Sequence, residues 1–220
     1  MSRSLPRRTA APDALGAASM APGDEASRKE VLERRAAAAS AGHLGDEAVA
    51  RAAVADPAPS VRIAGYCSLV RLGAARAEDG ARASVDPDPG VRRAACELAP
   101  GLPGADYRRL LGDHDPSVSE AAAYALGEVR DASAVAALAA VAVSHNDQLC
   151  RESAVAALGA IGHVAGKAAV LAALGDVATV RRRAVVALAA FEGPDVDAAL
   201  ASCLADRDWQ VRQAAEDLSD

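Results

Sequence analysis

Aromatic residues are scarce in this sequence, whose 220 residues include one tryptophan, one phenylalanine and three tyrosines. Strands favour aromatic and β-branched side chains, whereas alanine is the best helix former, and alanine fills 59 positions here. The composition therefore speaks against a β-sandwich or barrel. The sequence also has no apolar run close to the roughly 20 residues that span a bilayer. We expect a soluble, all-helical protein without a membrane segment.

Closely spaced cysteines are absent as well. The four are Cys67, Cys96, Cys150 and Cys203, so no C-x-x-C pair is present to bind zinc or to exchange thiols. Reduced thiols within helices are the expected state, which suits a cytoplasmic protein. Residues 1–26 lack the apolar stretch of a secretory signal. We predict a disordered tail over 1–26, with Met20 as a second candidate initiator, and a folded region over 27–220.

The sequence also has no excess of basic residues, since 30 acidic residues outnumber 24 lysines and arginines and give a net charge of −6. Nucleic-acid binding relies on a basic surface and on aromatic side chains that stack on bases. The charge and the single tryptophan therefore disfavour a nucleic-acid partner.

A short pattern returns along the chain: an Asp-rich turn, a Val-Arg pair, and then small and apolar residues. Its anchors are Val61, Val91, Val118, Cys150, Val180 and Val211. The anchors are 27 to 32 residues apart, a period typical of solenoids. An alanine follows each anchor by three or four residues and a leucine by seven or eight, which is the apolar stripe of an amphipathic helix.

Each unit is predicted to be a helix, a short turn and a second helix. Asp-Pro turns place an N-cap before the second helix, with proline at its first position. Glycines are expected to end helices: Gly73, Gly127, Gly159 and Gly193. The capping-box sequence at Ser27 predicts an N-terminal capping helix that runs to about Ser40. The predicted fold is an all-α, right-handed α-solenoid of about six helix pairs with this capping helix.

The recurring Asp, Val-Arg, alanine and leucine, as from Asp56 to Leu69, resemble the HEAT repeat, in particular the short bacterial variety named after phycobilisome lyases. The resemblance extends over about 46–220. It implies an armadillo-like helical scaffold or adaptor, although chromophore lyases and a few enzymes also use this repeat. The third unit departs from the pattern with Ser119 in place of arginine. The fourth has Cys150 for valine and a His145-Asn146-Asp147 turn, so a bend or specialised surface is expected in the middle units.

An aspartate six residues before an arginine recurs in the turns. The pairs are Asp56/Arg62, Asp86/Arg92 and Asp206/Arg212, with Asp176/Arg182 as a looser version. Stacked helices lie about 8 to 10 Å apart, so these residues are predicted to form a structural ladder. In the alternative interpretation, the arginines stay partly free and form a positive row for an acidic partner.

The second helix of each pair is expected to line the concave face of such a solenoid. Its candidate partner-binding residues are Tyr66, Arg93, Glu120, Tyr124, Glu152, Val155, Arg182 and Val186. Together they predict an apolar strip with charges at its rim, and Tyr66 and Tyr124 are its aromatic anchors. Alternatively, the side chains five and six residues after each anchor pack under the next repeat. Trp209 is either a lid over the terminal core or an exposed anchor.

No catalytic pattern is visible, because the sequence lacks a nucleophile elbow, a phosphate-binding loop, a zinc-protease motif and a dinucleotide fingerprint. No histidine precedes a glutamate, the pairing that HEAT-like iron-dependent hydroxylases use for metal ligation. His114 and His145 lie in consecutive turns near aspartates, so a divalent-metal site is the alternative to solvated turn residues. We predict a non-catalytic adaptor without metal or cofactor that binds a protein or peptide in a bacterial cytoplasm; the alternative is a lyase-like or metal-dependent enzyme subunit.

Overall fold

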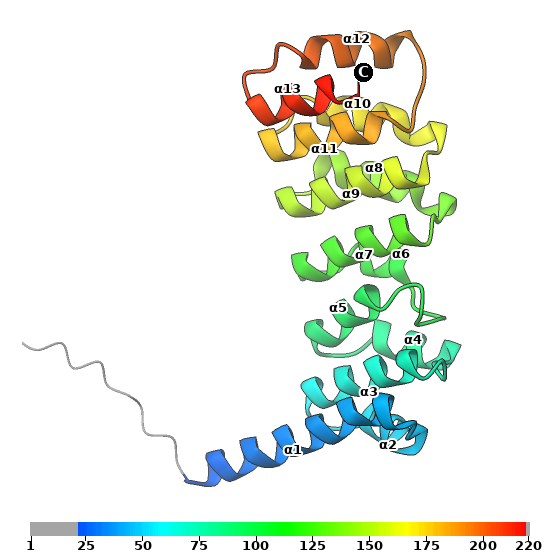
Figure 1. Cartoon of the computed structure of the whole chain (residues 1–220), viewed down its shortest axis with the longest axis vertical. Coiled ribbons are helices and arrows are strands. Elements are labelled where there is room, and N and C mark those ends of the chain that lie inside the picture. The colour runs from blue at the N-terminus through cyan, green and yellow to red at the C-terminus, as the bar shows by residue number, and fades with distance from the viewer. Residues whose placement is uncertain (1–21, 219–220) are drawn as a thin grey trace, which may run out of the picture.

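The computed structural model of the chain describes residues 22–218, which form a single column of stacked helices (Figure 1). This part contains thirteen α-helices and two 3-10 helices and no strand, so the chain is an α-solenoid. Of the predicted tail, residues 1–21, including Met20, lie outside the described residues, as do 219–220. None of the described helices is long and apolar enough to cross a membrane.

Six helix pairs follow one another along the column. Their first helices are α2 (Glu47–Ala53), α4 (Ala77–Ser84), α6 (Tyr107–Leu110), α8 (Val135–Ser144), α10 (Lys167–Ala173) and α12 (Pro194–Cys203). Their second helices are α3 (Pro59–Arg71), α5 (Pro89–Glu97), α7 (Pro116–Glu128), α9 (Gln148–Ile161), α11 (Ala178–Leu188) and α13 (Trp209–Glu216). The 3-10 helices η1 (Ala132–Ala134) and η2 (Val164–Gly166) lead into α8 and α10.

The N-terminal helix α1 (Pro22–Leu44) is longer at both ends than the predicted helix. It packs on α3 and continues the row of second helices at the lower end of the column (Figure 1). The side chain of Ala38 is buried, whereas those of residues 26–30 are exposed. The first turns of α1 therefore project beyond the first helix pair.

Aspartates begin most of the second helices. The carboxylates of Asp88, Asp115, Asp147 and Asp208 each accept a hydrogen bond from a backbone N–H in the first turn of the helix that follows. Such a bond satisfies an amide that has no partner within the helix. Side-chain capping thus forms the predicted helix starts at Asp88, Asp115 and Asp208. The prediction is wrong at the Asp56-Pro57 turn, where the N-cap of α3 is Ala58 and has no capping side chain.

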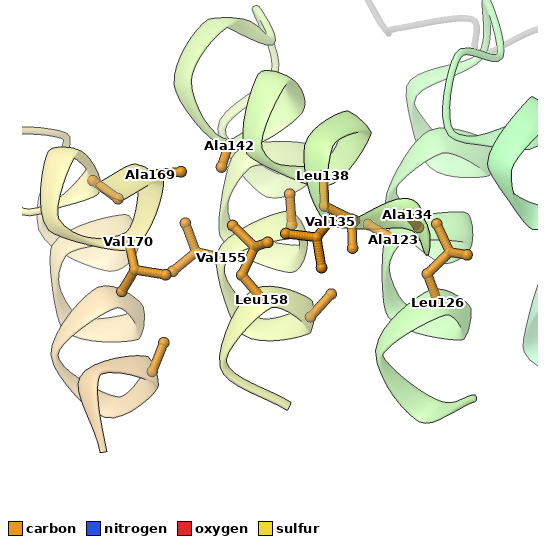
Figure 2. Packing of buried hydrophobic residues seen from close by; sticks show 14 of the residues in the cluster. Ala123, Leu126, Ala134, Val135, Leu138, Ala142, Val155, Leu158, Ala169 and Val170 are labelled. Carbon is orange, nitrogen blue, oxygen red and sulfur yellow. The ribbon is translucent and has the colours of Figure 1, made fainter. Parts of the chain in front are cut away.

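The repeat anchors form the centre of the core. Val91, Val118, Cys150, Val180 and Val211 are all fully buried. Figure 2 shows the packed layer at α7, α8, α9 and α10, where alanines fill the spaces between valine and leucine side chains. Small side chains let the helices approach closely, which is how an alanine-rich sequence reaches the density of a folded core.

The regular stacking is interrupted between α5 and α6. The sequence predicts a helix from Gly104 to Leu111, but α6 is a single turn, and an irregular segment occupies 98–106. Pro100 and Pro103 cannot donate the backbone hydrogen bonds of a helix interior. Gly80 of α4 lies so close to this segment that a Cβ there would be 2.2 Å from the Pro103 oxygen. This irregular segment joins the second unit to the third, and it packs against α4.

Two of the glycines expected to end helices lie inside them instead. Gly127 of α7 faces Ala157 of α9, and Gly159 of α9 faces Ala187 of α11. A Cβ on these glycines would lie only 3.0 Å and 2.7 Å, respectively, from the nearest atom of the facing alanine. These glycines allow consecutive second helices to touch at the backbone. Gly73, by contrast, follows the end of α3 with φ +64°, whereas Gly193 precedes α12.

The same close contact shows that α1 packs on α3 as one second helix packs on the next. A Cβ on Gly42 of α1 would lie 2.9 Å from the Ser68 hydroxyl oxygen of α3, at the register of the Gly127 and Gly159 contacts. The Ser68 hydroxyl donates to the Ala38 carbonyl oxygen at 2.7 Å. The predicted capping helix therefore has the packing of a second helix.

Candidate partner-binding surface

The six second helices, with α1 beside them, present one face to solvent, which we call the second-helix face. Two rows of side chains lie along it, two and six residues after each anchor. The first row is Ile63, Arg93, Glu120, Glu152, Arg182 and Gln213. The second row is Cys67, Glu97, Tyr124, Ala156, Val186 and Asp217. All of these side chains are exposed or half-buried, because each lies on the side of its helix away from the anchor.

Six of the eight predicted partner-binding residues lie on this face. They are Arg93, Glu120, Tyr124, Glu152, Arg182 and Val186. Tyr124 and Val186 are well separated in the column, on α7 and α11. The structure thus distributes these residues over four helices and does not gather them into one cluster.

The prediction is wrong for Tyr66 and Val155. Tyr66 is 1% exposed and Val155 is fully buried, and Figure 2 shows Val155 within the packed layer that includes Leu158 and Val170. Both residues lie five positions after an anchor. One residue further along, the helix has turned by about 100°, which brings the next position out to solvent. The sequence did not decide whether the side chains five and six residues after each anchor are buried or exposed. In the structure, those five residues after the anchor mostly pack under adjoining elements, and those six residues after it face solvent.

Three large apolar side chains on this face stay exposed. The exposed fractions are 60% for Tyr124, 50% for Val186 and 64% for Trp209. Of the two predictions for Trp209, the structure matches an exposed side chain and not a lid over the terminal core. Exposed aromatic side chains of this size are enriched in protein interfaces.

Shallow grooves run between neighbouring helices of the face. One of about 280 Å³ lies between α11 and α13 and is lined by Arg182, Val186 and Trp209 among others. Another of about 320 Å³ lies between α9 and α11 and shares Val186 with it. A third, of about 410 Å³, lies between α1 and α3. The face thus has apolar grooves toward both ends of the column.

Charges on the face alternate along the column. Arg93 pairs with Glu97 at 2.8 Å, and Arg183 pairs with Glu152 at 3.2 Å. Arg182 takes part in no hydrogen bond or ion pair with any described residue. The acidic side chains of the face therefore lie mainly in the middle, and arginines flank them.

A second feature, along the edge formed by the turns, is a ladder of arginines and aspartates. In five places an arginine of a second helix or of α1 donates two hydrogen bonds to the aspartate carboxylate of the next turn, and we call each such contact a rung. The rungs are Arg34 to Asp56, Arg62 to Asp86, Arg92 to Asp113, Arg151 to Asp176 and Arg181 to Asp206. Their donor–acceptor distances lie between 2.6 and 3.3 Å, in the paired geometry that is strongest for a guanidinium and a carboxylate.

The rungs join repeats in a way that differs from the predicted pairs. Within one repeat, Arg62 donates to the backbone oxygens of Asp56 and Pro57, and the Asp56 carboxylate is bound by Arg34 instead. The same holds for Arg212, which donates to the backbone oxygen of Asp206. In the fifth repeat, Arg181 donates to the backbone oxygen of Asp176. Arg182, which the sequence paired with Asp176, is exposed to solvent. Each guanidinium therefore connects its own turn to the next one.

Arg34 was missed by the sequence analysis, although a signal for it exists. It precedes Arg62 by 28 residues, within the range of the repeat spacing, and Gly42 follows it in the register of Gly127 and Gly159. The helix has no valine anchor before Arg34 and no Asp turn. The pattern therefore did not register α1 as part of the repeat.

One rung is missing between the third and fourth repeats. Ser119 replaces the arginine, and its hydroxyl donates to the Leu111 backbone oxygen at 2.6 Å. His145 replaces the aspartate of the next turn, and its Nδ1 accepts from the Asp147 backbone N–H at 3.1 Å, the same bond that Asp86 accepts from Asp88. Both members of the rung are thus replaced by side chains that keep the local turn bonds.

The paired guanidinium groups shift the titration of their partners. Hydrogen bonds from Arg34, Arg92, Arg151 and Arg181 hold the pKa of Asp56, Asp113, Asp176 and Asp206, respectively, below the usual range. These carboxylates remain ionised to lower pH than they would in the unfolded chain. These four rungs are therefore charged contacts at neutral pH.

The histidines and cysteines do not come together. Among residues 22–218, no group of three or more histidine, cysteine, aspartate or glutamate side chains is placed to hold a metal ion. His145 and His163 use Nδ1 to accept backbone hydrogen bonds in their turns, and the Asp113 carboxylate near His114 is bound by Arg92. Three of the four cysteines are buried, and burial raises the pKa of Cys96 to about 12. These thiols pack as small apolar side chains.

A comparison with protein families agrees with this architecture. A family model described as HEAT repeats matches residues 80–159 and 140–219. No curated protein sequence matches the chain. A solved structure of human deoxyhypusine hydroxylase in complex with glycerol is 22% identical and covers 86% of this chain and 78% of that one, with a TM-score of 0.46. The family match does not distinguish the phycobilisome-lyase variety, which stays a prediction.

Proposed function

Because this chain belongs to the HEAT-repeat family and carries exposed apolar side chains along one face, we propose that it is a non-catalytic scaffold or adaptor that binds a protein or peptide there. The binding surface in this proposal is the second-helix face. The observation that carries it is the exposure of Tyr124, Val186 and Trp209 on that face.

Burial by a partner would remove these side chains from water. Each apolar side chain that is buried contributes roughly 1.5 to 3 kcal/mol of transfer free energy, and aromatic residues dominate the energetics of interfaces. Arg93, Glu120 and Arg182 surround the apolar positions and would form a polar rim. This mixture supports recognition of another protein in preference to simple aggregation.

The cysteines support a reducing, cytoplasmic location for this interaction. All four are free thiols, and proteins of oxidising compartments usually pair theirs. The non-catalytic part of the proposal is tested by absorbance spectra and metal analysis of protein purified from its own host. A bound chromophore or stoichiometric iron would contradict it and favour a lyase-like or metal-dependent enzyme subunit.

The binding face is tested with the variant Tyr124→Glu/Val186→Glu. Both side chains are exposed, so the variant should remain folded, but two carboxylates on the apolar strip should oppose burial. Affinity capture from host lysate with identification by mass spectrometry is expected to retain a partner with the wild type and to lose it with this variant.

A matched control is Val143→Glu/Val164→Glu, which adds the same two charges at exposed apolar positions of the first-helix layer. We expect the control to retain the partner. Retention of the same protein by all three chains would show that the second-helix face is not the binding surface. Capture of nothing by the wild type would count against the adaptor function itself.

A further inference from the structure

The groove between α1 and α3 has a volume of about 410 Å³ and lies at the N-terminal end of the second-helix face. It exists because α1 takes the place of a second helix. Gly42 and Ser68 bring the two helices together at one point, and Ala39 and Ala64 leave space beside that contact. Ile63 adds a larger apolar side chain to the same lining.

Its charged lining is basic on both sides. Arg35 and His43 come from α1 and Arg71 comes from α3, and none of the described lining residues is acidic. Arg35 and Arg71 form no hydrogen bond or ion pair with any described residue, whereas the neighbouring Arg34 is fully engaged with Asp56. In a chain with a net charge of −6, two unpaired arginines beside one groove are a local excess of positive charge.

The carboxylates nearest to this groove are engaged in other contacts. The N-cap of α3 is Ala58, and the Asp56 carboxylate before it accepts from the Ala58 N–H and is bound by Arg34. Ser60 in the first turn of α3 lines the groove. Glu97 of α5, whose charge reaches Cys67, is paired with Arg93. Neither Asp56 nor Glu97 lines the groove, and both are paired with arginines.

We propose that this groove binds an acidic peptide segment of a partner protein. Carboxylates of the segment pair with Arg35 and Arg71, since guanidinium groups bind carboxylates with two parallel hydrogen bonds. An apolar side chain between the carboxylates packs on Ile63. The inference rests on the proposed function, because the groove is part of the second-helix face.

The charge of the occupant distinguishes a partner from this chain's own N-terminal residues. Residues 1–21 contain Arg3, Arg7 and Arg8 against Asp13, so they carry positive charge and do not complement a basic groove. An acidic segment does complement it, and the apolar lining favours a segment that also carries leucine-like side chains.

The test uses a fluorescein-labelled peptide that alternates glutamate with leucine, and a counterpart with glutamine in place of glutamate. Fluorescence anisotropy with the full chain is expected to show binding of the glutamate peptide and about tenfold weaker binding of the glutamine peptide. Arg35→Gln/Arg71→Gln should weaken binding of the glutamate peptide by a similar factor. The control Arg82→Gln/Arg207→Gln changes the net charge equally at exposed positions outside the groove and should bind as the wild type does.

Cys67 reports where the peptide lies. It lines the groove and is the exposed cysteine, whereas the other three are buried. Alkylation of Cys67 by iodoacetamide, followed by mass spectrometry, should slow when the glutamate peptide is present. Equal binding by the groove variant and its control, unchanged alkylation of Cys67, or no binding at millimolar peptide would each overturn the proposal.

Two further outcomes separate the possible failures. If capture with Tyr124→Glu/Val186→Glu shows a face-bound partner but the peptide does not bind, the groove proposal fails while the proposed function stands. If the chain self-associates and Arg35→Gln/Arg71→Gln abolishes this in sedimentation, the occupant is a second copy, and the acidic segment of another protein is wrong.

Discussion

Tyr66 shows how a single position of a helix decides between core and surface. Its ring is buried, and its hydroxyl oxygen lies in the core without a hydrogen-bond partner among the described residues. Burial also raises the pKa of this hydroxyl. A buried polar group without a partner costs free energy on folding. The ring therefore stabilises the first repeats, whereas the hydroxyl opposes part of that gain.

We expect Tyr66→Phe to stabilise the chain by about 1 kcal/mol, because it removes the unpaired hydroxyl and keeps the ring. Urea unfolding followed by circular dichroism measures the change. Tyr107→Phe is the matched control, since the Tyr107 hydroxyl donates to the Leu102 backbone oxygen at 3.3 Å, and its loss should not stabilise. A Tyr66→Phe variant less stable than the wild type would mean that the hydroxyl has a partner.

The position of Tyr66 could not be predicted from the sequence for a geometric reason. The repeat pattern identifies the buried anchors, because valine occupies them in five of the six units. It does not distinguish positions five and six after the anchor, since small or apolar residues are common at both and acidic residues occur at both. Their separation depends on where the next repeat lies, which is a property of the stacking. Tyr124, one position further than Tyr66 in its own repeat, is consequently exposed.

Among the elements, the turn before α9 differs from all others in the ladder. Ser119 and His145 together replace a rung, and each keeps its own local hydrogen bond. An arginine at residue 119 without a carboxylate at residue 145 would be buried and unpaired, because Ser119 is fully buried. The two substitutions are therefore matched, and the interface between the third and fourth repeats is held by apolar packing on this edge.

We expect Ser119→Arg alone to destabilise the chain, because its guanidinium would meet His145 and no carboxylate. Ser119→Arg/His145→Asp should restore the rung and recover stability. In a double-mutant cycle measured by urea unfolding, the coupling should be favourable by about 1 kcal/mol or more. Additive effects of the two substitutions would show that a guanidinium at residue 119 does not reach the next turn.

The elements themselves could largely be predicted. The repeat spacing and the Asp turns predict six helix pairs, and the structure has six. The short α6 and the segment 98–106 differ from the prediction because prolines and close packing against α4 override the helical pattern there. The role of α1 was hidden because it lacks the valine anchor and the turn that define the repeat.

At the scale of the whole molecule, the rungs make stability depend on pH. The pKa values of Asp56, Asp113, Asp176 and Asp206 are lower in the folded chain than in the unfolded one. As the pH falls, the unfolded chain binds protons first, so the free energy of unfolding decreases. The contribution is complete above about pH 5 and is lost as the pH falls through the folded-state pKa values.

We expect the thermal midpoint to fall steeply below about pH 5, as measured by circular dichroism between pH 7 and pH 3. Asp113→Asn should be about 3 kcal/mol less stable at pH 7, because it leaves the buried Arg92 without a carboxylate. Its stability should depend less on pH than that of the wild type. An identical pH dependence in the two proteins would show that this carboxylate titrates normally in the folded state.

The missing rung also has a mechanical consequence. The paired guanidinium and carboxylate groups along one edge resist separation of consecutive turns. The junction between the third and fourth repeats has no such pair. Bending that opens this edge should therefore occur mainly at that junction. The contact between Gly127 of α7 and Ala157 of α9, on the second-helix face, should act as the pivot. Small-angle scattering should give a narrower range of molecular lengths for Ser119→Arg/His145→Asp than for the wild type. The column is then expected to bend mainly at this junction, which lies between the groove at its N-terminal end and the two grooves toward its C-terminal end.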